Sequence, residues 1–141
     1  MLWLLIIVSI IALDQTVKYI INKKVSIGKS MPTDNKLLYI THVENTGIAL
    51  SLFENKGYIV IPLTIITQIV MLYFLYKFNN GVLRLALSFI IGGGFGNLMD
   101  RLAKDSVTDF FQLRFGSHGS PIFNVADIFI FFGAIMFSIK L

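Results

Sequence analysis

The chain has 141 residues, of which 55% are hydrophobic and 14% are charged, and its mean hydropathy is +0.76. Soluble domains typically carry ~25% charged residues, so this composition excludes a small soluble protein and also a disordered one. The absence of cysteine excludes disulfides and thiol chemistry. The net charge of +4 comes from dispersed basic residues, which indicates contact with anionic lipid rather than with nucleic acid.

Four apolar stretches, at about 2–21, 58–76, 82–99 and 122–139, approach the ~20 residues that a helix needs to cross a bilayer. Backbone groups in lipid must be hydrogen-bonded within their own segment, so we predict four transmembrane helices. The first stretch lacks a basic start and a small-residue cleavage site, so we expect it to be retained rather than removed as a signal peptide. At this length we expect a single domain, 1–141.

Two long connections, at about 22–57 and 100–121, are expected on one side of the membrane, because only a tight turn at 77–81 joins the second stretch to the third. In the first connection, residues 37–43 and 48–53 are predicted strands around a turn at 44–47. In the second, residues 107–115 are a predicted strand with alternating faces. The two histidines, His42 and His118, are expected to be solvated in these connections, and no metal site is predicted.

Orientation is harder to predict. Most Lys and Arg residues lie on the side of the long connections, and the positive-inside rule would place that side in the cytoplasm. Folded loops are weak topological signals, however, so the charge count alone leaves the orientation open.

Half of the eight acidic residues, namely Asp14, Asp100, Asp109 and Asp127, lie within or beside apolar stretches. An ionisable group near the bilayer centre costs ~2.5–3.5 kcal/mol on insertion scales. We therefore expect these carboxylates to face one another or a polar cavity. Asp14 and Lys18 are four residues apart and can pair on one helix face; this pair either fixes the depth of the helix or takes part in chemistry.

The third stretch ends in the segment GGGFGNLMDR, residues 92–101. Gly92 and Gly96 form a small-residue face that lets another helix or a ligand approach the backbone. Asn97 and Asp100 lie about one turn apart, and Arg101 is available to pair with a carboxylate. The segment is either a helix-packing face or one wall of a polar site.

Asp109 lies in a predicted strand and Asp127 in the fourth apolar stretch, without a basic neighbour in sequence. Two facing carboxylates can share one proton, and such a pair can hydrolyse a peptide bond by general acid–base catalysis. Alternatively, each aspartate only binds backbone groups or an arginine. Asn124 precedes Asp127 by about one helical turn, and we expect its amide to orient that carboxylate.

Five segments in the same order resemble those of bacterial lipoprotein signal peptidase (signal peptidase II): DQTVK (14–18), NTGIA (45–49), GNLMDR (96–101), VTDF (107–110) and FNVAD (123–127). The resemblance implies an α-helical integral membrane protein with four transmembrane helices and a small extracytoplasmic β-sheet cradle. It further implies an aspartyl endopeptidase that removes the signal peptide from prolipoproteins bearing diacylglyceryl-cysteine, cutting before the lipidated cysteine. The implied location is the bacterial cytoplasmic membrane, with cytoplasmic termini and an active site near the outer face.

By matching position, the resemblance implies that Asp109 and Asp127 are catalytic. It implies that further residues bind substrate or support the site: Asp14, Lys18, Asn45, Gly47, Ala49, Gly96, Asn97, Asp100, Arg101, Asn124 and Ala126. No cofactor is expected, and the implied partners are prolipoproteins, membrane lipids and the inhibitor globomycin. The alternative function is a small proton-coupled membrane carrier that uses intramembrane aspartates, although the sequence shows no inverted repeat.

Overall fold

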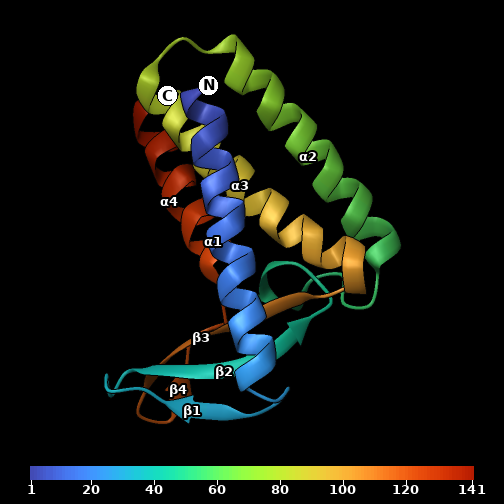
Figure 1. Ribbon diagram of the computed structural model, residues 1–141, viewed down its shortest axis with the longest axis vertical. Coiled ribbons are helices and arrows are strands. Elements are labelled where there is room, and N and C mark those ends of the chain that lie inside the picture. The colour runs from blue at the N-terminus through green and yellow to red at the C-terminus, as the bar shows by residue number, and fades with distance from the viewer.

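The computed structural model describes residues 1–141 with the exception of the side chain of Ala49, so the expected role of Ala49 lies outside the described part of the chain. Four α-helices pack into a bundle, and a small antiparallel β-sheet lies at one end of it (Figure 1). Both termini lie close together at the opposite end (Figure 1). This arrangement confirms the predicted α-helical membrane architecture with a small sheet on the side of the long connections.

Three helices are long and apolar enough to cross a membrane: α1 (Leu2–Lys24), α2 (Gly57–Lys77) and α3 (Gly81–Lys104). The fourth, α4 (Val125–Lys140), is also apolar but has 16 residues, or ~24 Å at 1.5 Å per residue. It begins later than predicted because Phe123 is held by the sheet: its N–H donates to the carbonyl of Phe111 at 2.9 Å.

Helix α3 is the centre of the bundle and packs against α1, α2 and α4. Its glycines allow this close packing. A Cβ on Gly92 would lie 2.8 Å from the Cβ of Ile10 on α1, and a Cβ on Gly93 would lie 2.5 Å from the carbonyl oxygen of Ala126 on α4. The predicted small-residue face of α3 is therefore confirmed as a packing face for α1.

The sheet has the order β1 (Ser30–Pro32), β2 (Leu38–Asn45), β3 (Val107–Phe115) and β4 (His118–Gly119). The prediction of a strand at 107–115 is confirmed, whereas that of a strand at 48–53 is wrong. Residues 49–51 form a short 3-10 helix, η1 (Ala49–Ser51), in which Leu50 has a φ of 57°. The N–H of Ile48 donates to the carbonyl of Leu52 at 2.8 Å, so this segment closes on itself instead of pairing with β2.

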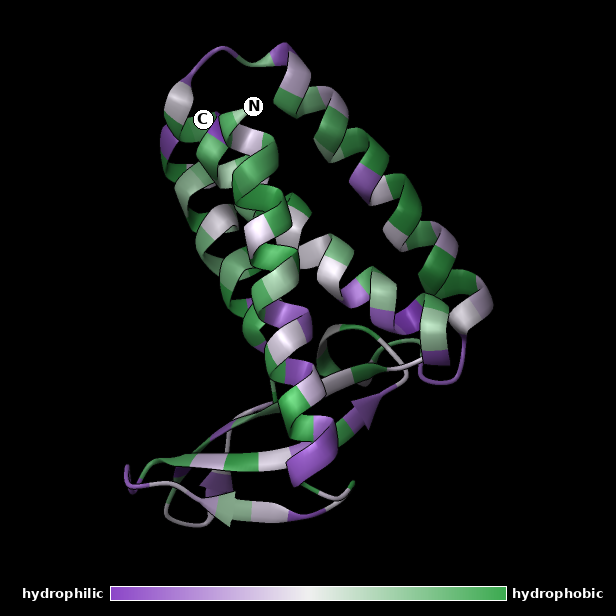
Figure 2. Ribbon diagram, viewed as in Figure 1, coloured by the Kyte–Doolittle hydropathy of each residue, from purple (hydrophilic) through white to green (hydrophobic). Residues whose placement is uncertain are grey.

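The apolar core is divided between the two ends of the molecule. One cluster (Ile21, Val25, Phe110 and Val125) joins α1, β3 and the start of α4, and another (Ile7, Leu87 and Ile91) joins α1 to α3. Apolar residues cover the helices away from the sheet, whereas polar residues gather in the sheet and at the adjoining helix ends (Figure 2). The buried polar side chains lie mainly where the bundle meets the sheet.

Candidate active site

A groove of about 730 Å³ is lined by residues of α2, α3 and α4 and by residues of the sheet and its connections. Both Asp109, on β3, and Asp127, in the first turn of α4, line it. Its other polar lining groups are Asn45, Asn97, Arg101, Thr64, Thr67 and Gln68, and most of the remaining lining is apolar, including Leu63, Ile90, Ile122, Phe123, Ile130 and Phe131. The groove thus combines a carboxylate pair with a long apolar surface, as ligand sites commonly do.

Local helix chemistry positions Asp127. Asn124 is the N-cap of α4, and its side-chain oxygen accepts from the N–H of Asp127 at 2.9 Å. In return, the N–H of Asn124 donates to the Asp127 carboxylate at 3.1 Å. This reciprocal capping box satisfies backbone donors at the start of the helix and fixes the carboxylate at its N-terminus, where the helix dipole favours negative charge.

The side-chain amide of Asn124 has a role that the sequence analysis missed. Its Nδ2 donates to Oδ1 of Asp109 at 2.8 Å, while its oxygen binds the N–H of Asp127 in the capping box. The Asp127 carboxylate itself accepts from the backbone N–H of the cap, because a capping box uses the side-chain oxygen and the backbone donor. One fully buried residue therefore contacts both carboxylates.

Two further amides complete the hydrogen bonding of the pair. Asn45 Nδ2 donates to Oδ2 of Asp109 at 3.2 Å, and Asn97 Nδ2 donates to Oδ1 of Asp127 at 3.0 Å. Each carboxylate thus accepts two bonds from neutral donors. Among the described residues, neither carboxylate lies within 4.0 Å of a basic nitrogen.

The electrostatic consequence is a raised proton affinity. Burial raises the pKa of Asp109 from 3.8 to about 7, and the negative charge of Asp127 contributes to the increase. The hydrogen bonds from Asn45 and Asn124 act in the opposite direction but are outweighed. Two carboxylates that cannot both ionise at low cost retain a proton near neutral pH. Such a pair can offer a general base and a general acid at the same pH.

A second acidic group lies behind the first and contains one basic side chain. Lys18 Nζ lies 2.8 Å from the Asp14 carboxylate and 3.1 Å from the Asp100 carboxylate. Lys18 is 2% exposed and Asp14 0%, so this is a buried ion cluster and not an interfacial pair. The predicted pairing of Asp14 with Lys18 is confirmed, and Asp100 joins it.

Gly96 and Ala126 allow Asp14 to reach its position. A Cβ on Gly96 would lie 2.5 Å from Asp14 Oδ2, so a side chain there would displace the carboxylate. The other oxygen of Asp14 accepts from the N–H of Ala126 at 2.9 Å, which adds a second cap to α4. The carboxylate therefore joins α1, α3 and α4 at one point.

Asn97 connects the ion cluster to the carboxylate pair. Its oxygen accepts from Lys18 Nζ and from Asn124 Nδ2, each at 3.0 Å. With its oxygen bound in this way, its NH₂ group must point toward Asp127. The ion cluster therefore fixes the direction of a donor in the candidate site.

Arg101 and Gly47 meet on the other side of the groove. Arg101 Nη2 donates to the carbonyl of Gly47 at 3.1 Å, and among the described residues no carboxylate lies within 4.0 Å of it. Its charge interacts at longer range with those of Asp127, Asp109 and Asp100. The N–H of Gly47 donates to Asn45 Oδ1 at 2.9 Å, which leaves the NH₂ of Asn45 to face Asp109. A Cβ on Gly47 would clash with the carbonyl of Leu52, so glycine is required here.

Comparison with known proteins shows the family to which the chain belongs. The family model described as Signal peptidase (SPase) II matches residues 6–141. The chain belongs to the signal peptidase II family. It is therefore a protease of lipoprotein processing, and its apolar helices make it a membrane protein.

Two solved structures described as bacterial membrane enzymes, both determined by the in meso method, are similar to this peptidase. The one at 2.3 Å resolution is 33% identical, with a TM-score of 0.91, and the match covers 98% of this chain and 85% of that one. The one at 1.9 Å is 33% identical, with a TM-score of 0.88, over 98% of this chain and 90% of that one.

The sequence analysis did not identify two polar groups that support Asp100 in the peptidase. Gln15 Nε2 donates to Asp100 Oδ1 at 3.0 Å, and the N–H of Thr108 donates to Asp100 Oδ2 at 3.1 Å. Gln15 directly follows Asp14, and Thr108 directly precedes Asp109, and both aspartates were predicted site residues. A polar residue next to a predicted buried acid was therefore the signal in the sequence that could have identified these two groups.

The expectation that His42 is solvated is wrong, whereas His118 is exposed as expected. His42 is 1% exposed and contacts the Val25 carbonyl through Nδ1 at 2.6 Å and Glu44 through Nε2 at 2.9 Å. Burial raises the pKa of Glu44, but hydrogen bonds from His42 and from Ser106 and Lys104 outweigh it and leave that pKa below its ordinary value. This group links α1, β2 and the end of α3, away from the groove.

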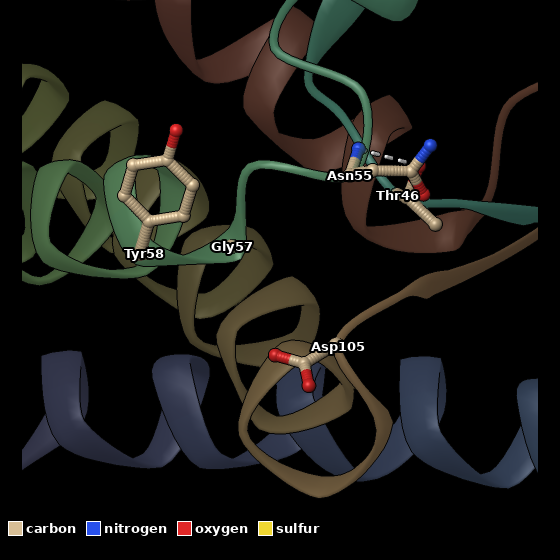
Figure 3. Close-up of a pocket in the computed structure, with 5 residues that line it drawn as sticks. All are labelled: Thr46, Asn55, Gly57, Tyr58 and Asp105. Atoms are coloured by element: carbon tan, nitrogen blue, oxygen red, sulfur yellow. Dashed lines mark hydrogen bonds between the residues drawn. The ribbon is translucent and has the colours of Figure 1, made fainter.

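A smaller pocket of about 290 Å³ lies between the start of α2 and the end of α3, as Figure 3 shows. Its lining residues are Thr46, Asn55, Gly57, Tyr58 and Asp105, and none of them is a predicted site residue. Among the described residues, no three His, Asp or Glu side chains are placed to hold a metal ion. The groove with Asp109 and Asp127 is therefore the candidate active site of the peptidase.

Proposed function

We propose that the chain is an aspartyl lipoprotein signal peptidase in which Asp109 and Asp127 are the catalytic residues. The observation that carries this proposal is the placement of two buried carboxylates in one groove, held only by neutral donors, with the pKa of Asp109 raised to about 7. A protease needs a base for water and an acid for the carbonyl oxygen, and this pair supplies both.

The proposed reaction begins with one carboxylate ionised and the other protonated. The ionised carboxylate takes a proton from a water molecule as the water oxygen attacks the scissile carbonyl carbon. The protonated carboxyl donates its proton to the carbonyl oxygen, which gives a neutral tetrahedral intermediate. Collapse of the intermediate breaks the C–N bond; a proton passes from its hydroxyl group to the pair and another from the pair to the leaving nitrogen, so the pair returns to its starting state.

The substrate that we propose is a prolipoprotein with a diacylglyceryl-modified cysteine, cut on the N-terminal side of that cysteine. Such a substrate stays in the bilayer, because its signal segment and acyl chains are apolar. The apolar lining beyond the carboxylate pair, formed by residues such as Ile90, Ile130 and Phe131, suits these groups. Asn45, Arg101 and the other predicted supporting residues would then hold the pair and the substrate backbone in place.

For the orientation, we propose that the whole chain acts as one domain in the bacterial cytoplasmic membrane, with the termini in the cytoplasm and the sheet outside. The sheet and the termini lie at opposite ends of the bundle, which fits this arrangement (Figure 1). The family match supports it, although the distribution of Lys and Arg favours the reverse.

The test is cleavage by the purified, full-length protein in liposomes. We expect it to cut a diacylglyceryl-modified prolipoprotein, to leave the same precursor without lipid uncut, and to be inhibited by globomycin. Failure to cut the lipidated precursor, together with proton-dependent solute uptake into the same liposomes, would contradict the proposal and favour the carrier. Equal cleavage of the unmodified precursor would contradict the proposed specificity.

A further inference from the structure

One buried polar side chain in the groove has no assigned role. Gln68 lies in the middle of α2, an otherwise strongly apolar helix in which only Val60 and Gln68 are buried. The Gln68 residue is 4% exposed, and its Oε1 has no hydrogen-bond partner among the described residues. A buried acceptor without a partner is unfavourable in an apolar environment, so a glutamine at this position needs an explanation.

The neighbouring helix is shaped around this amide. A Cβ on Gly94 of α3 would clash directly with the Nε2 of Gln68, so only glycine leaves room for it. Nearby on α2, the hydroxyls of Thr64 and Thr67 donate to carbonyls of their own helix at 2.8 and 2.9 Å. Gln68 therefore lines the groove from α2 and carries a buried acceptor that has no partner.

The amide lies close to the candidate catalytic pair. Gln68, Gly94 and Asp127 all line the groove. Gly94 precedes Asn97, which binds Asp127, by three residues, or ~4.5 Å along the helix axis. This displacement is away from the sheet and toward the apolar part of the groove, so Gln68 lies about one helical turn beyond the pair.

We propose that the side-chain amide of Gln68 turns toward the groove when substrate binds and forms a hydrogen-bonding subsite, which accepts a backbone N–H of the substrate peptide on the N-terminal side of the scissile bond. This inference rests on the proposed function, in which the apolar signal segment occupies this part of the groove. A peptide must be extended where it is cut, and an extended backbone in an apolar groove has unpaired N–H groups that need acceptors. The diacylglyceryl esters and acyl chains offer no donor, so the acceptor fits the peptide and not the lipid.

The test uses synthetic lipopeptide substrates in which single backbone amides before the scissile bond are replaced by esters, which removes one N–H at a time. For the unmodified wild-type protein, we expect one ester position to lower kcat/KM about tenfold, the loss of one useful hydrogen bond. Gln68→Met should lower kcat/KM on the all-amide lipopeptide by a similar factor, mainly through KM. In Gln68→Met, the ester at the sensitive position should then have no further effect.

Two controls separate this role from a structural one. Gln68→Met removes an unpaired buried polar group, so its thermal stability should be equal to or higher than that of the wild type. Ile69→Met, on the exposed outer face of the same helix, should leave cleavage unchanged. Ester effects that are the same in both enzymes, or the absence of any sensitive position in the wild type, would overturn the subsite alone. No cleavage of the all-amide lipopeptide would contradict the proposed function and the subsite with it.

Discussion

The two buried acidic groups of this peptidase differ in whether a basic side chain contacts them directly. In one, Lys18 lies within 3.1 Å of both Asp14 and Asp100. In the other, Asp109 and Asp127 accept bonds from asparagines and a backbone N–H, without a basic partner within 4.0 Å in the described chain. The first group is held together by a buried ion pair, whereas in the second the pKa of Asp109 is raised to about 7. We therefore expect the same residue type to serve packing in one place and chemistry in the other.

The largest effect is expected at the pair of Asp109 and Asp127. Asp109→Asn and Asp127→Asn each remove a proton-transfer group, so cleavage of the lipidated precursor should fall by at least ~10³-fold. Asparagine has nearly the same shape as aspartate, so the variants should still insert and fold. Rates per folded molecule in liposomes measure this, with the exposed Asp34→Asn as a matched control of wild-type activity. Processing near the wild-type rate by either site variant would refute the catalytic pair.

The ion cluster of Asp14, Lys18 and Asp100 should respond through stability. Lys18→Met leaves Asp14 and Asp100 buried without a counter-charge. Removal of one partner of a buried ion pair typically lowers the free energy of unfolding by ~3–5 kcal/mol, and we expect a loss of that size here. The triple variant Asp14→Asn, Lys18→Met, Asp100→Asn removes all three charges together and should recover most of that loss. Unfolding in detergent by denaturant compares the three proteins. Equal stability of Lys18→Met and the wild type would show that the ion cluster does not hold the helices together.

A smaller loss of stability is expected from Gly96→Ala. The new Cβ would lie 2.5 Å from Asp14 Oδ2, so either the carboxylate or a helix must shift, at a cost of ~1–3 kcal/mol for overpacking. Gly81→Ala, at the first residue of α3, meets no atom within 4 Å and is the control. If the two alanine variants unfold at the same denaturant concentration, close approach of Asp14 to α3 is not important.

The pH dependence should distinguish the groups more finely. The folded-state pKa of Asp109 is raised from 3.8 to about 7, so its proton is bound more tightly in the folded than in the unfolded protein. The stabilisation from this proton is complete below the unfolded pKa and is lost as the pH rises through about 7. Asp109→Asn should remove this part of the pH dependence of unfolding. Activity should fall about tenfold per pH unit well above neutrality, because the acid of the pair is then ionised. A rate that stays constant to pH 9 would contradict a shared proton.

The elements that could be predicted from the sequence are those that depend on nearby residues. The length of the apolar stretches predicted the helices, and the period-two alternation predicted the strand at 107–115. The segment 48–53 has strand-like residues, yet the hydrogen bond from Ile48 to Leu52 closes it into a loop. His42 was misjudged because its burial depends on Glu44 and on the end of α1, which no local pattern shows.

The candidate site itself was reached by resemblance more than by spacing. The residues alone allowed Asp109 and Asp127 to be unrelated, because one lies in a predicted strand and the other in a separate apolar stretch. The part played by Asn124 was missed in detail because its two hydrogen-bonding ends bind different aspartates. Gln68 was passed over because a single uncharged residue in an apolar stretch carries no pattern.

The most direct test compares Asp127→Asn with the triple variant that removes the Asp14, Lys18 and Asp100 charges. The measurement is the initial rate at which each variant, per folded molecule, cleaves a diacylglyceryl-modified prolipoprotein in liposomes at pH 6. We predict no product from Asp127→Asn and measurable, reduced cleavage by the triple variant, because only Asn97 loses a hydrogen bond at the site. Cleavage by Asp127→Asn at a rate equal to or above that of the triple variant would contradict the assignment of chemistry to one acidic group and of packing to the other.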